Sequence, residues 1–138
     1  MVTINLTEEM FASGQPIAQG EVNIWMKKYA PKELLENLAG LKLSEMRIDS
    51  NRAIIGHSET GHHHVLEPVL ADVPFHEAAQ ILIDAVNDNL MDIKLLQSCN
   101  LIHLRGFDTH KTYTLPPGDY IRSIREEQGP QGWVRVAD

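Results

Sequence analysis

The sequence predicts a mainly β protein of the α+β class, with an antiparallel sheet that is open or barrel-like and two short helical insertions. Three observations support this class. Apolar and polar residues alternate in many short runs, as the inward and outward side chains of a half-buried strand do. Clusters rich in Gly, Pro, Asn and Asp separate these runs and predict turns. Only two segments instead repeat their apolar residues at helical spacing, and these are the predicted helices.

Two strands are predicted before the first helix. Residues Val2–Leu6 alternate as a strand does, and Thr7–Glu9 can cap a turn that closes near Gly14. We interpret Gln15–Gly20 as a connection. Val22, Ile24 and Met26 then alternate with polar neighbours, which predicts a second strand with one buried face.

The first helix is predicted between Pro31 and Gly40. Proline suits the first helical position, and glycine suits the residue just past a helix end. Leu34, Leu35 and Leu38 form one apolar stripe between them. We expect the chain to return as a strand afterwards.

The second helix is predicted over Pro74–Asn87. Asp72 is a plausible cap for this helix. The apolar residues at helical spacing are Phe75, Ala78, Ala79, Leu82, Ala85 and Val86.

Strands and turns account for the other segments after residue 40. The predicted strands are Leu41–Ile48, Ala53–His57, Met91–Leu96, Asn100–Arg105, His110–Leu115, Tyr120–Arg125 and Trp133–Val136. Short strands leave sheet edges, and the last strand could pair with another copy across a two-fold axis. We therefore expect a homo-oligomer or another protein partner.

Length and charge limit the classes of function. A chain of 138 residues is expected to form a single domain, residues 1–138. The net charge of −7 disfavours nucleic acid as a partner, because phosphate-backbone binders need a basic face. The lone Cys99, the absence of a signal-peptide pattern and the lack of a long apolar run predict a cytoplasmic protein without a membrane span.

Four of the seven histidines lie between Ile54 and Glu67. A four-residue hairpin loop between His57 and His62 would place these two residues opposite each other. His64 would share their face, since side chains alternate along a strand.

Three imidazoles on one face predict a divalent-metal site, because neutral imidazole is the commonest nitrogen ligand. The predicted ligands are His57, His62, His64 and, if the sheet curls, His110. His63 should point away, and binding should weaken below about pH 6.5, where free imidazole becomes protonated. The alternative is an exposed polar turn with solvated or hydrogen-bonded imidazoles.

Several motifs resemble a group of small uncharacterised bacterial and phage proteins. The motifs are G-E-V-N-I-W from Gly20, G-H-S-E-T-G-H-H-H from Gly56, T-H-K-T-Y-T-L-P-P-G-D-Y from Thr109, and I-R-E-E-Q-G-P-Q-G-W-V-R-V-A-D at the end. That group has a G-H-x-H element, a downstream histidine, L-P-P-G-x-Y and G-W-x-x-V-A-D. Where the group has H-E-E-H, this chain has Phe107–His110. The resemblance implies a fold and a site, and it implies no established activity.

A second, partial resemblance is to the first motif of cupins, G-x5-H-x-H, formed here by Gly56, His62 and His64. In cupins, two histidines and a glutamate on barrel strands hold a metal. Glu67 comes one residue early for this role and would face away on an extended strand. The resemblance implies a metal-dependent enzyme with His62, His64 and His110 as ligands. Two functional classes therefore stay open, an accessory binding protein and a cupin-like enzyme.

Overall fold

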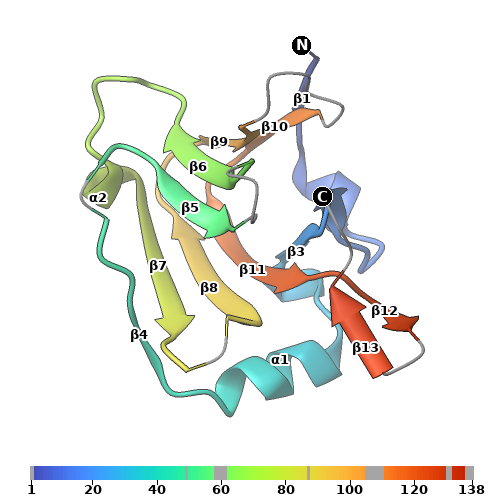
Figure 1. The fold of residues 1–138 in the computed structure, drawn as a ribbon. Coiled ribbons are helices and arrows are strands. Elements are labelled where there is room, and N and C mark those ends of the chain that lie inside the picture. Colours follow the sequence, from blue (N-terminus) through green and yellow to red (C-terminus); the bar gives the residue numbers. More distant parts are fainter. Residues whose placement is uncertain are drawn as a thin grey trace.

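In the computed structural model of the protein, two β-sheets pack against each other with the main hydrophobic core between them (Figure 1). The structure describes residues 2–48, 50–57, 62–86, 88–104, 111–129 and 132–135. The predicted class, mainly antiparallel β with two α-helices, is confirmed.

The first sheet has five strands. Their order is β1 (Thr3–Asn5), β10 (Thr112–Leu115), β9 (Cys99–His103), β6 (His64–Pro68) and β5 (Ala53–Gly56). Strand β1 runs parallel to β10, and the other neighbours are antiparallel.

The second sheet has six antiparallel strands. Their order is β2 (Ile17–Gln19), β3 (Val22–Met26), β11 (Gly118–Ile124), β8 (Leu90–Leu95), β7 (Ala79–Asp84) and β4 (Leu43–Glu45). Strand β2 corrects the interpretation of Gln15–Gly20 as a connection. Across the residue ranges given above, neither sheet closes on itself, so the architecture is not a closed barrel.

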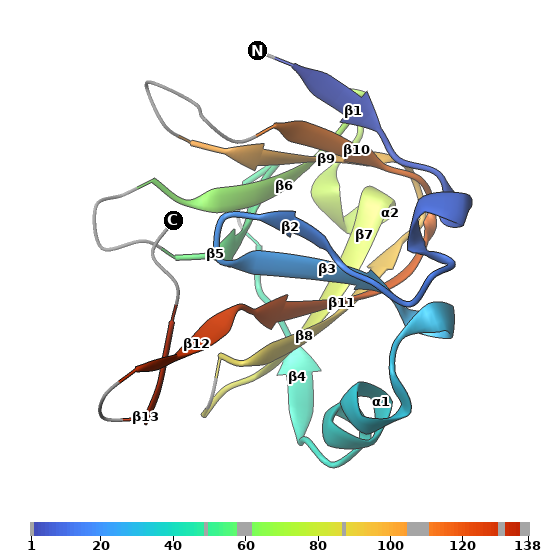
Figure 2. The same ribbon diagram turned by 90° about the vertical axis from the view of Figure 1, so that its right-hand side faces the viewer.

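A separate hairpin of β12 (Glu126–Gly129) and β13 (Gly132–Arg135) follows β11 and projects from the body of the protein (Figures 1 and 2). The predicted last strand is therefore present, and within the chain its partner is β12.

Helix α1 (Lys32–Ala39) forms where it was predicted, between Pro31 and Gly40. Its leucines pack with Ile121 and Leu90 on the side of the six-stranded sheet away from the main core. Two short 3-10 helices, η1 (Glu8–Phe11) and η2 (Lys27–Tyr29), lie in the N-terminal part of the chain. No helix in the described part of the chain is long and apolar enough to cross a membrane.

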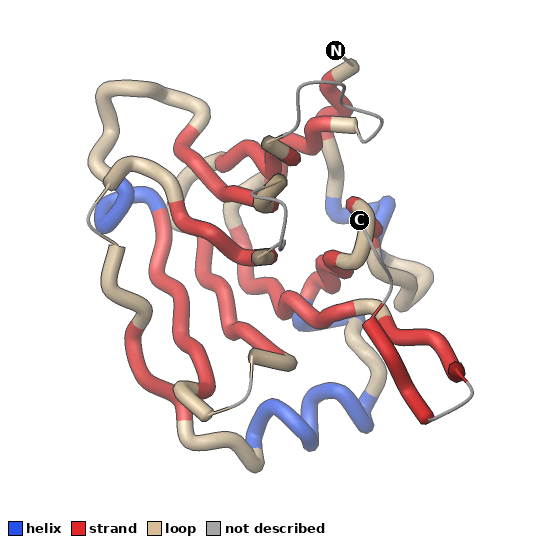
Figure 3. Tube along the Cα trace, viewed as in Figure 1, coloured by secondary structure: helices blue, strands red, loops and turns tan. Residues whose placement is uncertain are grey.

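The helix predicted over Pro74–Asn87 is wrong. Of the residues described in this range, 74–86, only α2 (Phe75–Ala78) is helical, and β7 follows directly as an inner strand of the six-stranded sheet (Figure 3). The same residues also fit a period of two, because Ala79 and Ile81 are buried while Gln80 between them is exposed. Pairing with β8 and β4 satisfies the backbone of β7 and decides between the two periods.

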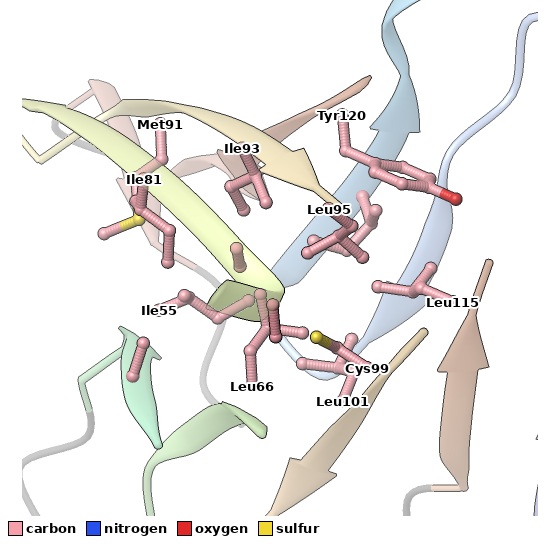
Figure 4. Close-up of a cluster of buried hydrophobic side chains, with 14 of the residues drawn as sticks. Ile55, Leu66, Ile81, Met91, Ile93, Leu95, Cys99, Leu101, Leu115 and Tyr120 are labelled. Atoms are coloured by element: carbon pink, nitrogen blue, oxygen red, sulfur yellow. The ribbon is translucent and has the colours of Figure 1, made fainter. Parts of the chain in front are cut away.

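The core joins the inner faces of both sheets, as Figure 4 shows. Ile55, Leu66 and Leu101 come from the five-stranded sheet, and Ile81 and Ile93 come from the six-stranded sheet. These side chains are almost completely buried. The histidines on β6 and β9 extend this inner face toward one end of the core.

Candidate functional site

The register between β5 and β6 decides which histidines meet. It shifts midway along β5, so that Gly56 pairs with His64. Continuing this register brings His57 beside His63, and their ring centroids are 5.2 Å apart. A bulge moves every later side chain relative to the partner strand. The prediction that His57 lies opposite His62 is therefore wrong, and so is the prediction that His63 points away from it.

His62, His103 and His64 form a row of imidazoles, here named the histidine row. His64 and His103 are direct cross-strand partners, and their rings stack at 4.4 Å with an interplanar angle of 17°. The ring of His62 lies 6.4 Å from that of His103 at 83°. His64 and His103 are 0% and 1% exposed, whereas His62 is only partly buried. The row therefore runs from the surface into the protein.

His62 and His64 thus contact the same partner ring, in agreement with the predicted shared face. His103 was not among the predicted ligands, although the sequence carried one signal for its place. The residues around it alternate as a strand does, so His103 faces inward together with Leu101 and Cys99. Only the register with β6 places it against His64.

Gln19, at the end of β2, links the two sheets at the histidine row. It is 1% exposed. Its Nε2 atom donates hydrogen bonds to the carbonyl oxygens of Leu101 at 3.2 Å and Lys111 at 2.8 Å. Its Oε1 atom lies 2.8 Å from Nδ1 of His64. Sequence reasoning missed Gln19, because a single glutamine in an expected connection carries no site signal.

Gly56 allows β5 to lie close to both Val22 and His64. A Cβ atom at this position would stand 2.6 Å from Cγ2 of Val22 and 3.0 Å from Cδ2 of His64. Both neighbours are 0% exposed. The glycine is therefore required by close packing between the sheets.

Within the described residues, the structure adds no further candidate ligand to the histidine row. His110 lies outside the described residues. Glu67 forms an ion pair with Arg52 at 2.9 Å. It follows His64 by three positions along β6, and this odd separation puts its carboxylate on the opposite sheet face. Among the residues described, no group of three or more His, Cys, Asp or Glu side chains is already arranged to hold a metal ion.

A groove of about 740 Å³ lies elsewhere, at the L-P-P-G turn. Leu6, Met26 and Pro116 contribute to its apolar lining, and none of the histidines that the structure describes lines it. An ion pair of 2.7 Å between Lys28 and Glu8 lies at the same groove. The histidine row and this groove are thus separate features.

Comparison with protein-family models, curated proteins and solved structures finds no match to this chain.

Proposed function

We propose that this chain is a small accessory protein that binds a divalent transition-metal ion through the histidine row. The observation that carries the proposal is the gathering of the His62, His64 and His103 rings where the start of β6 pairs with the end of β9. Imidazole nitrogen suits zinc, nickel, copper and iron ions. The net charge of −7 also favours a cation over an anion.

The three histidines have different roles in this proposal. His64 is held by Gln19, and His103 is held against His64 by ring stacking. His62 lies closest to solvent and provides the route of entry. Because the rings of His64 and His103 are stacked nearly parallel, their nitrogens do not point at one common position. Binding therefore turns the rings of His62 and His103 until their nitrogens face the same ion as His64.

Three imidazoles are a sufficient ligand set for zinc. Zinc sites of this kind keep a fourth tetrahedral position for water, a further side chain or a bound molecule. The proposed set keeps His62 and His64 from the sequence prediction and replaces His57 with His103. His110 stays a predicted fourth ligand.

The cupin-like enzyme has less support. Within the described chain the two sheets do not close into a barrel. Glu67, the carboxylate nearest to the cupin pattern, is paired with Arg52 on the other sheet face. Neither observation favours a catalytic metal site.

Calorimetric titration of the metal-free protein with zinc chloride tests the proposal, using protein purified without a histidine-affinity column. We expect one ion per chain. His62→Ala should weaken binding more than about tenfold, since even the loss of a group that only orients a ligand costs 10–100-fold. His63→Ala is the matched control, because His63 contacts His57, and it should bind zinc as the unmodified protein does.

Circular dichroism would verify that both variants fold. Equal losses in the two variants would contradict the proposal. So would the absence of stoichiometric binding of zinc, manganese, iron and nickel by the intact protein. Either result would return the histidines to the alternative of a hydrogen-bonded polar cluster.

A further inference from the structure

The side-chain amide of Gln19 has only one orientation that suits its surroundings. Two backbone carbonyl oxygens, of Leu101 and Lys111, lie 3.2 and 2.8 Å from its Nε2 atom. Carbonyl oxygens only accept hydrogen bonds, so the amide NH2 group must face them. The flipped amide would place three oxygens together in a buried site and leave them without a proton between them.

This orientation fixes the proton on His64. With the NH2 group committed to the two carbonyls, the Oε1 atom faces Nδ1 of His64 at 2.8 Å. An amide oxygen only accepts, so Nδ1 must donate. A neutral imidazole carries one N–H group, and the lone pair of His64 is therefore on Nε2.

We infer that Gln19 is a positioning residue that holds His64 in the Nδ1–H tautomer and so presents its Nε2 lone pair as the metal-binding atom. The role of Nε2 as the metal-binding atom rests on the proposed function, whereas the tautomer of His64 does not. Histidines that bind metals through one nitrogen commonly donate the other N–H to a protein acceptor, which fixes the tautomer and the ring orientation. Gln19 supplies that acceptor from the opposite sheet.

The amide is the side chain that fits this position. A glutamate would also accept from Nδ1, but it has no N–H to donate to the two carbonyls. A methionine has nearly the same length, cannot donate to the two carbonyls and accepts only weakly from Nδ1. Gln19→Met therefore replaces the amide acceptor with a weak one at little change in volume.

Nitrogen-15 NMR of the imidazole rings tests the inference, because protonated and unprotonated ring nitrogens have clearly different shifts. In the metal-free protein we expect His64 to show a protonated Nδ1 and an unprotonated Nε2. Gln19→Met should shift His64 toward the Nε2–H tautomer and weaken zinc binding about 10–100-fold. Gln80→Met, at an exposed position of β7, is the matched control and should change neither quantity.

The possible failures are distinguishable. A protonated Nε2 on His64 in the unmodified protein overturns the inference even if zinc binds. A protonated Nδ1 without zinc binding supports the role of Gln19 in tautomer selection and overturns the proposed function. The spectrum of the unmodified protein is decisive for the tautomer, so the test does not depend on the folding of Gln19→Met.

Discussion

Replacing Gly56 with alanine should destabilise the fold, because the added methyl group has no room. The new Cβ atom would lie 2.6 Å from Cγ2 of Val22, and 3.0 and 3.2 Å from Cδ2 and Cβ of His64. Carbon atoms in good contact are about 3.5–4.0 Å apart, so Val22 would have to move by roughly 1 Å. Val22 and His64 are both 0% exposed, and neither can move into solvent.

The expected loss follows from the cost of overpacking. Forcing an extra methyl group into a filled core costs about 1–3 kcal/mol, and two rigid neighbours favour the upper half of that range. Alanine also restricts the unfolded chain more than glycine does, and this entropic effect offsets about 0.4–1 kcal/mol of the overpacking cost. We therefore expect Gly56→Ala to lower the free energy of unfolding by about 1–2.5 kcal/mol.

Urea denaturation followed by tryptophan fluorescence measures this change. Gly40→Ala is the matched control, because a Cβ atom there would have its nearest neighbours at 3.7 Å, which is ordinary contact. Gly40→Ala should change the free energy of unfolding by no more than about 0.5 kcal/mol. Val22→Ala removes the closest obstructing atom, so the double variant with Gly56→Ala should be less destabilised than the sum of the two single changes. Unchanged stability in Gly56→Ala, or full additivity with Val22→Ala, would refute the packing argument.

Two further predictions concern the core. Ile81→Ala should lower the free energy of unfolding by about 2–5 kcal/mol, and Leu82→Ala by clearly less, because Ile81 is 1% exposed and Leu82 is partly exposed. A larger loss at Leu82 in chemical denaturation would contradict the assignment of this segment to a strand, since Leu82 belongs to the apolar face of the rejected helix. Burial raises the pKa of the Cys99 thiol from 9.0 to about 11, so the thiol contributes stability below about pH 9 that is lost as the pH rises through about 11. Thermal denaturation against pH should show a smaller alkaline decline in Cys99→Ala, and a decline of unchanged size would argue against this contribution.

Local patterns predicted the elements whose signals are contained within a few residues. Proline and glycine mark the two ends of α1, because their backbone preferences act without any partner. The alternation in β3 likewise matches its burial pattern, with Val22, Ile24 and Met26 inside. The fold class follows from many such short signals together.

The segment that forms β7 shows where local patterns fail. Its apolar residues fit both a helix and a strand, so the sequence pattern alone could not choose between them. The choice depends on β4 and β8, which supply the backbone hydrogen bonds from both sides. Strand β2 was missed for a related reason, since its three residues are a strand only by pairing with β3.

For the candidate site, the sequence determined that histidines gather near one hairpin and that His62 and His64 face the same side, where both rings lie beside that of His103. Tertiary structure alone decided which other groups join them. One bulge in β5 turns His57 toward His63. The β6–β9 register brings His103 against His64, and the packing of the two sheets brings in Gln19, which is 45 residues from His64 in the chain. These contacts depend on register and sheet packing between distant segments, and no local spacing in the sequence encodes them.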